Sequence, residues 1–222
     1  MTGRARRVLL RTARHAGFAA VGTAIIAVVV ELARYEDGFE PQARMSLAAA
    51  YAGLLFFAAT LMVGPFYVWR GRTLPVSSTL RRDLGIWTGI HALMHTLIGL
   101  EVYYPGEFWR NFVNDSGTAT MAPRTDLLGW ANHTDLLAAL LVLMLLCLSN
   151  DFALKRLTLR RWKSLQRWAY GAAGLTVLHG WLYQIYERRL LGFVASLAAI
   201  VLAIVLAQAW GASRRRRARP QA

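Results

Sequence analysis

Six apolar runs divide the chain, and each is bounded by charged or turn-forming residues. They cover residues 17–32, 45–69, 84–104, 133–148, 165–186 and 190–210. A helix that crosses a bilayer needs roughly 17–25 predominantly apolar residues, and the first and fourth runs lie at the short end of that range. The pattern predicts an all-α polytopic membrane protein, a bundle of six transmembrane helices.

The segments between the runs carry turn signals. Residues 70–80 include Gly71 and Pro75, and Pro105-Gly106 follows the third run. Residues 106–132 are predicted to be a loop whose aromatic side chains suit a membrane interface. A basic start before an apolar run also fits a cleaved signal peptide. The length of the first run, and the lack of a small-x-small site before the acidic patch that follows it, favour a retained span.

Basic residues are distributed very unevenly between the two predicted sides of the membrane. Of the 26 Lys and Arg residues, 20 lie in the N-terminus, the second and fourth connections and the tail, and 6 lie in the other connections. This asymmetry predicts that both termini are cytoplasmic. The predicted domains are a basic N-terminus (1–16), a six-helix transmembrane domain (17–211) and a basic tail (212–222).

Charge and cysteine content exclude several classes of function. The formal net charge of +14 would suit nucleic-acid binding. The basic residues lie between apolar runs, however, so membrane orientation and contact with anionic lipid explain them better, and no nucleic-acid partner is expected. Cys147 is the only cysteine, which excludes an internal disulfide and CxxC metal chemistry.

Histidines inside the apolar runs are the candidate functional residues, because ionisable groups are costly in a membrane. His95 lies 13 residues after Arg82, and His179 lies 12 residues after Arg167. At 1.5 Å per residue these offsets are about 20 and 18 Å, so both imidazoles reach nearly the same depth. Two histidines at equal depth on neighbouring helices are what a b-type haem needs as axial ligands.

Other interpretations of these histidines remain open. They could be polar groups that hydrogen-bond between helices. His91 lies one turn from His95, about 13 Å from the Arg82 marker. A His91/His95 pair could hold a metal ion if His133 or Asp135 supplied a third ligand. The rival function is therefore a haem-free membrane scaffold or metal transporter.

Several motifs occur in an order and spacing that match a known family. They are Arg81-Arg82-x-Leu84-Gly85-x-Trp87, His95, Arg161-Trp162-Lys163-x-Leu165, Tyr170 and Leu178-His179. Over residues 80–186 the chain resembles the ferric reductase-like transmembrane domain, and within it the haem-binding membrane subunits of the bacterial methionine sulfoxide reductase system. Relatives commonly have histidine where this chain has Gln166.

The resemblance implies a bacterial inner-membrane haem b protein, the electron-transfer subunit of an oxidoreductase. Its iron ligands would be His95 and His179, with His91 nearby and one haem expected because Gln166 replaces a further histidine. Electrons would come from a quinol or a cytoplasmic flavin reductase and pass to an external redox protein or a ferric species. A flavin or a quinone is a possible additional cofactor. The chain contains no G-x-G-x-x-G motif after a strand, so no nucleotide-binding segment is expected.

Overall fold

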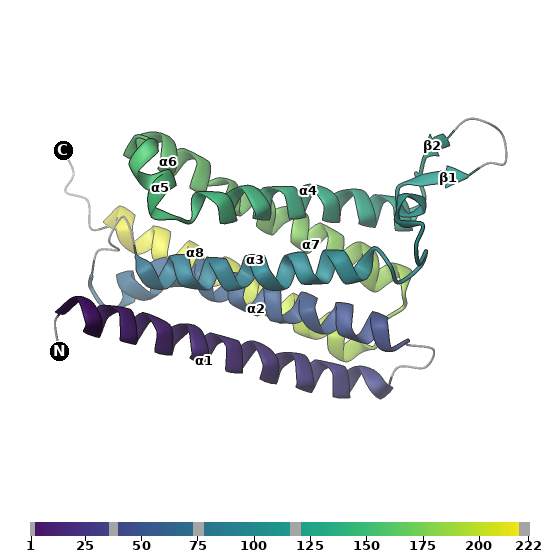
Figure 1. Cartoon of the computed structure of the whole chain (residues 1–222), viewed down its shortest axis with the longest axis horizontal. Coiled ribbons are helices and arrows are strands. Elements are labelled where there is room, and N and C mark those ends of the chain that lie inside the picture. The colour runs from purple at the N-terminus through teal and green to yellow at the C-terminus, as the bar shows by residue number, and fades with distance from the viewer. Residues whose placement is uncertain (1–2, 36–39, 73–77, 116–120, 218–222) are drawn as a thin grey trace.

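The computed structural model describes residues 3–35, 40–72, 78–115 and 121–217. It is 84% helical and all-α, as the sequence predicts. Figure 1 shows the long helices side by side in one bundle, with the start of the first and the end of the last at the same end. The long helices are α1 (Gly3–Leu32), α2 (Pro41–Trp69), α3 (Thr79–Gly99), α4 (Leu127–Leu148), α7 (Trp168–Tyr186) and α8 (Leu191–Arg217).

Shorter elements close the two ends of the bundle. Helices α5 (Asp151–Arg156) and α6 (Leu159–Gln166) lie at the end where α1 starts (Figure 1). The opposite end carries the turns η1 (Ala33–Tyr35) and η2 (Phe108–Asn111) and the antiparallel hairpin of β1 (Val113–Asp115) and β2 (Met121–Pro123). The sequence predicted only a loop where η2 and the hairpin lie.

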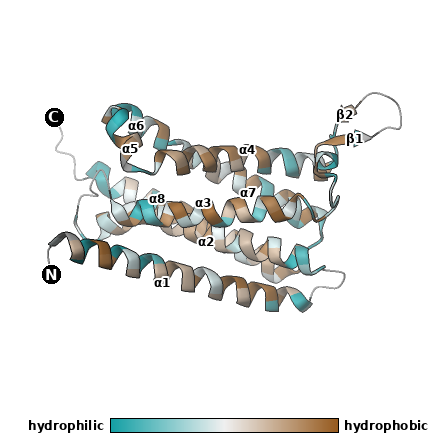
Figure 2. Cartoon of the chain, viewed as in Figure 1, coloured by the Kyte–Doolittle hydropathy of each residue, from teal (hydrophilic) through white to brown (hydrophobic). Residues whose placement is uncertain are grey.

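Four helices, α1, α2, α4 and α8, have the length and apolar composition of membrane spans. Their outward faces expose many large apolar side chains, such as Leu137 on α4 and Leu206 on α8. Figure 2 shows this apolar character along the helices, with hydrophilic residues gathered at α5 and α6. Apolar surface of this extent on a bundle is typical of contact with lipid. The chain is therefore a membrane protein.

Helices α3 and α7 are not among the described helices that are long and apolar enough to cross a membrane. Helix α3 contains Arg81, Arg82 and Asp83 near its start, and α7 has 19 residues. The crossing of the membrane by these two helices, and hence the six-span topology, stays a prediction.

The helix ends differ from the predicted boundaries, and nearby side chains bind the free backbone groups at those ends. Helix α3 begins at Thr79, where the Ser78 hydroxyl accepts a hydrogen bond from Arg81 N, and it ends at Gly99 rather than at residue 104. Just after that end, the buried Asn111 side chain donates to the Leu100 carbonyl at 2.9 Å. Free carbonyls at a helix end need such partners.

Three further boundaries are also displaced. Helix α4 starts at Leu127, before the predicted residue 133, because Asp126 caps it by accepting from Gly129 N at 2.8 Å. The predicted fifth run (165–186) is divided at Arg167: its first two residues end α6, and the rest forms α7. Helices α1 and α8 continue without a break across residues 16 and 212, the predicted boundaries of the basic termini.

A buried carboxylate fastens α1 to α3. Asp83 is fully buried, and its Oδ1 accepts from Arg11 Nη2 at 2.9 Å. Arg14 pairs with the other oxygen, and His15 Nε2 lies 3.5 Å from Oδ1. His15 in turn accepts a hydrogen bond from Trp87 Nε1 at 3.1 Å. The predicted basic N-terminus (1–16) is thus packed against α3 through Arg11, Arg14 and His15.

Candidate functional site

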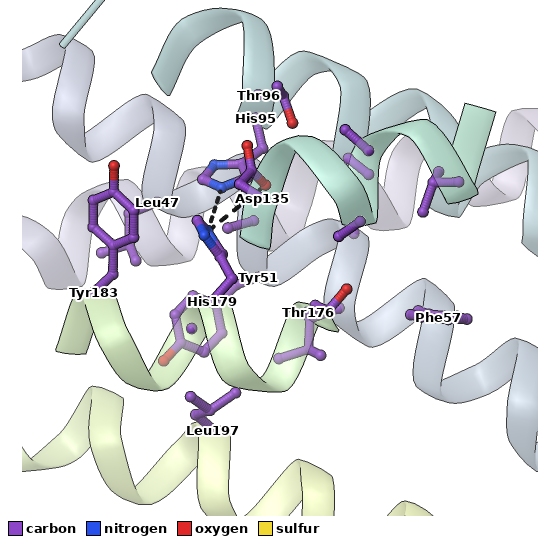
Figure 3. Close-up of a pocket in the computed structure, with 18 of the residues that line it drawn as sticks. Leu47, Tyr51, Phe57, His95, Thr96, Asp135, Thr176, His179, Tyr183 and Leu197 are labelled. Atoms are coloured by element: carbon purple, nitrogen blue, oxygen red, sulfur yellow. Dashed lines mark hydrogen bonds and ion pairs between the residues drawn. The ribbon is translucent and has the colours of Figure 1, made fainter. Parts of the chain in front are cut away.

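Two histidines from different helices meet inside the bundle. His95 Nε2 on α3 lies 3.4 Å from His179 Nε2 on α7, and the ring centroids are 5.6 Å apart. Figure 3 shows both imidazoles pointing toward one another, with Leu47 and Tyr51 of α2 beside them. The equal depth predicted from the arginine markers is therefore matched by direct contact between the two side chains.

Both rings have their other nitrogen held by a backbone carbonyl. His95 Nδ1 lies 2.9 Å from the Ser46 carbonyl oxygen and 3.0 Å from the Ser46 hydroxyl. His179 Nδ1 lies 3.0 Å from the Ala131 carbonyl oxygen. A carbonyl can only accept, so in each ring Nδ1 carries the proton and donates it. This hydrogen bond fixes the tautomer and orientation of a metal-binding histidine.

The electrostatic consequence concerns the two Nε2 atoms. With Nδ1 protonated, each neutral ring presents an Nε2 lone pair, and the two lone pairs face each other across 3.4 Å. Two facing lone pairs repel unless an electron-pair acceptor lies between them. The arrangement is thus suited to an acceptor shared by both nitrogens, such as a metal ion.

Asp135 of α4 adds a carboxylate to the pair. Its Oδ1 lies 3.8 Å from His179 Nε2. One ligand atom from each of His95, Asp135 and His179 lies within 4.8 Å of the others, and all three side chains are partly or fully shielded. From the sequence, Asp135 was predicted only as a possible third ligand for a His91/His95 pair. The sequence feature that points to Asp135 is that it is the only acidic residue in the apolar run 133–148.

Two cavities adjoin the three residues. The larger, about 130 Å³, extends toward the middle of α3 and α4 as far as Thr88 and Val142. The smaller, about 50 Å³, extends toward the hairpin end as far as Asn132 and Phe112. Small residues line much of the larger cavity: Ala50, Gly53, Ala92, Ala138, Ala139 and Gly180. They let the backbones of α2, α3, α4 and α7 stay close to whatever occupies the space.

His91 is placed apart from this group. Its Nδ1 lies 2.8 Å from the Trp87 carbonyl oxygen, and its ring stacks on Phe56 at 5.2 Å. On its other side, a Cβ added to Gly22 of α1 would lie 2.7 Å from His91 Nε2. The group of potential metal ligands among the described residues includes His95 but not His91. His91 is therefore a residue of α3 that packs against α1 and α2.

The remaining histidine considered as a ligand also lies elsewhere. His133 Nε2 lies 3.2 Å from the Arg124 carbonyl oxygen, near the start of α4, and its ring packs on Phe112 and Trp130. The sequence prediction of a third ligand from His133 therefore has no support in the geometry, since the side chain faces the hairpin end.

A polar and aromatic network continues from His179 toward the hairpin end. The Tyr183 ring lies 4.9 Å from the His179 ring, and its hydroxyl donates to Asn132 Oδ1 at 2.6 Å. Tyr103 packs on Tyr183 and donates to Glu187. Arg189 pairs with the same carboxylate. Sequence reasoning missed this network, because its members come from three separate segments.

The donor chemistry of the two histidines fits a haem group. Both Nε2 atoms are free to bind, both Nδ1 atoms are held, and the surroundings are mostly apolar. To hold one haem iron between them, the two imidazoles would have to move apart from their present Nε2–Nε2 separation of 3.4 Å. A porphyrin is also bulkier than either cavity, so its entry must spread the helices at the small residues.

Comparison of the chain with protein-family models, with curated proteins and with solved structures found no match.

Proposed function

We propose that this chain is a membrane haem b protein that transfers electrons across the inner membrane. The observation that carries the proposal is the meeting of His95 and His179, with both Nδ1 atoms bound to carbonyls and both Nε2 atoms facing each other at 3.4 Å. A haem held by His95 and His179 would supply reversible one-electron chemistry.

The proposed topology has six spans with both termini in the cytoplasm. Its support is the distribution of 20 basic residues against 6. The start of α1 and the end of α8 lie at one end of the bundle (Figure 1), as this topology requires. Electrons would then enter from a quinol or a cytoplasmic flavin reductase and leave at the hairpin end, toward an external redox protein or a ferric species.

The chain's own residues have distinct tasks in this proposal. Ser46 and Ala131 orient the two imidazoles through their carbonyls. The apolar side chains of α2, α3, α4 and α7 exclude water, which lowers the local dielectric. Tyr183 and Tyr103 place aromatic rings between the histidines and the hairpin end. These roles support the function of an electron-transfer subunit without a substrate site of its own.

A reduction assay tests the proposed electron transfer. The purified, flavin-free protein reconstituted with haem is expected to be reduced by an added quinol, or by a flavin reductase with NADPH. NADPH alone should reduce it only slowly, because no nucleotide-binding motif was found. Rapid reduction by NADPH alone, or no reduction by any of these donors, would contradict the proposal.

A second candidate function is a mononuclear metal site formed by His95, Asp135 and His179. Two imidazole nitrogens on a tetrahedral metal with bonds of about 2.0–2.1 Å lie about 3.3 Å apart, close to the observed 3.4 Å. With such a site, the protein would be a metal transporter or a haem-free membrane scaffold.

Metal analysis and one substitution separate the two candidates. A haem protein contains iron and shows a strong visible absorption band, whereas a zinc site shows neither. Asp135→Asn is expected to leave haem bound, because in the haem proposal only His95 and His179 hold the iron. Loss of one bound metal ion per chain in Asp135→Asn, with no visible band in the wild type, would favour the three-residue metal site instead.

A further inference from the structure

A third cavity, about 540 Å³, lies at the end of the bundle that carries α5 and α6. Its walls come from α2, α3, α4, α6, α7 and α8. Five basic side chains line it: Arg81, Arg82, Lys163, Arg167 and Arg215. No acidic side chain is among its lining residues. The cavity therefore has a strongly positive mouth.

Most of these cations have no carboxylate to neutralise them. Within the described part of the chain, Arg81, Lys163, Arg167 and Arg215 form no ion pair. The nearby buried acid, Asp83, is already bound by two arginines of α1. Like charges gathered in a cavity raise the energy of the fold unless an anion joins them.

The deeper part of the cavity is apolar. Phe57, Val142, Leu145 and Leu146 line it, and Phe57, Thr88 and Val142 also line the cavity beside His95. The wall nearer the mouth holds Trp162, whose Nε1 donates to the Leu148 carbonyl at 3.1 Å. A ligand that fills this space must combine an anionic group with an apolar body.

We propose that this cavity binds the phosphate group of an anionic, phosphate-bearing amphiphile. Phosphate oxygens accept charge-assisted hydrogen bonds from arginine and lysine. Basic pockets between transmembrane helices on the cytoplasmic side bind phospholipid head groups. The apolar floor favours a membrane phospholipid over a soluble phosphate ester, because Phe57, Val142, Leu145 and Leu146 give the apolar body of an amphiphile a surface to contact.

The binding site does not depend on haem. Its phosphate-binding side chains lie on α3, α6 and α8 and at the junction of α6 and α7, at the end of the bundle, and its readout is bound lipid. Failure of the haem proposal would therefore leave this one standing, and the reverse also holds.

The test is lipid binding by the full chain in detergent, measured by native mass spectrometry. The probes are dioleoylphosphatidylglycerol, which is anionic, and dioleoylphosphatidylcholine, which is neutral overall. The variant is Arg81→Gln/Arg167→Gln, which removes two charges from the cavity. The matched control is Arg160→Gln/Arg161→Gln, which removes two exposed charges of α6 that do not line it.

We expect the wild type and the control to retain one phosphatidylglycerol in preference to phosphatidylcholine. The cavity variant should bind it about thirtyfold more weakly, since each basic residue near an anionic lipid contributes about 1 kcal/mol. Arg81→Lys/Arg167→Lys keeps both charges and should restore most of the affinity, which separates lost binding from misfolding. Equal losses in the cavity variant and the control, or no preference between the two lipids, would overturn the proposal.

Competition distinguishes the two sources of phosphate. If a phospholipid is the ligand, millimolar inorganic phosphate or glycerol 3-phosphate displaces little of the bound phosphatidylglycerol. Full displacement by glycerol 3-phosphate would show that the cavity recognises the phosphate alone and takes a soluble ester, which would overturn the assignment to an amphiphile.

Discussion

The contact between Gly22 and His91 predicts that a single methyl group will have opposite effects in two backgrounds. In Gly22→Ala the new Cβ would lie 2.7 Å from His91 Nε2 and 2.8 Å from Cε1. The imidazole has little room to give, because Phe56 stacks on it at 5.2 Å and its Nδ1 donates to the Trp87 carbonyl. Either α1 must shift or the ring must leave its site.

The expected magnitude combines two terms of opposite sign. Overpacking of a tight contact costs about 1–3 kcal/mol. Replacing a helical glycine by alanine gains up to about 1 kcal/mol from helix propensity. Gly22→Ala should therefore destabilise the wild type by about 1 kcal/mol. In His91→Ala the ring is gone, so the same change should stabilise the protein by up to about 1 kcal/mol.

Equilibrium unfolding in mixed micelles, followed by far-ultraviolet circular dichroism, measures both effects. Gly17→Ala is the matched control, because it lies on the same helix and a Cβ there meets no atom within 4 Å. It should be neutral or stabilising in both backgrounds. If Gly22→Ala changes the free energy of unfolding of the wild type as Gly17→Ala does, the His91 ring does not limit the space at Gly22. The same conclusion follows if Gly22→Ala lowers that free energy equally without His91.

Three further predictions concern charge, pH and orientation. Asp83→Asn should lower the free energy of unfolding by about 2 kcal/mol, less than for a fully buried pair because the arginines of α1 are partly exposed; an unchanged stability would show that the cluster is dispensable. Burial raises the pKa of Asp126, but hydrogen bonds from a backbone N–H and from Arg124 outweigh it and hold that pKa below its usual value of 3.8. Asp126→Ala should therefore cost about 1 kcal/mol at neutral pH, and the difference from wild type should shrink as the pH falls below 3.8, because the stabilisation exists only while the carboxylate is ionised; a difference that does not depend on pH would contradict this. A reporter fused after Ala212 should be cytoplasmic and one at Asn114 exported, and the reverse result would invert the proposed donor and acceptor sides.

The central part of the fold could be predicted from sequence because a single physical rule determines it. Long apolar runs must be helical to satisfy their backbone in lipid, and all six runs are helical along most of their length. The same regularity made the similar depth of His95 and His179 predictable, because a rise of 1.5 Å per residue converts sequence offsets into depth.

Features that depend on tertiary partners could not be predicted in this way. The early end of α3 is accompanied by the Asn111 side chain binding the Leu100 carbonyl. The attachment of α1 through Asp83 pairs side chains about 70 residues apart in the sequence. No periodicity along one segment contains that information.

The different roles of His91 and His95 also depend on packing. Four residues along a helix rotate a side chain by about 40° and move it by about 6 Å. The sequence therefore places both on nearly one face, yet His91 packs against Gly22 of α1 while His95 reaches α2 and α7. Which neighbour lies on which side of α3 follows from the arrangement of the bundle and not from the spacing.

The reduced-minus-oxidised absorption spectrum of the purified protein, with haem quantified, tests whether His95 and His179 hold a haem. The wild type is expected to show a low-spin b-type spectrum with one haem per chain. His95→Ala and His179→Ala should each abolish it, because each removes one Nε2 ligand atom of the facing pair. His91→Ala should keep the haem. Absence of any haem band in the wild type, or loss of haem in His91→Ala with retention in His95→Ala, would contradict the account.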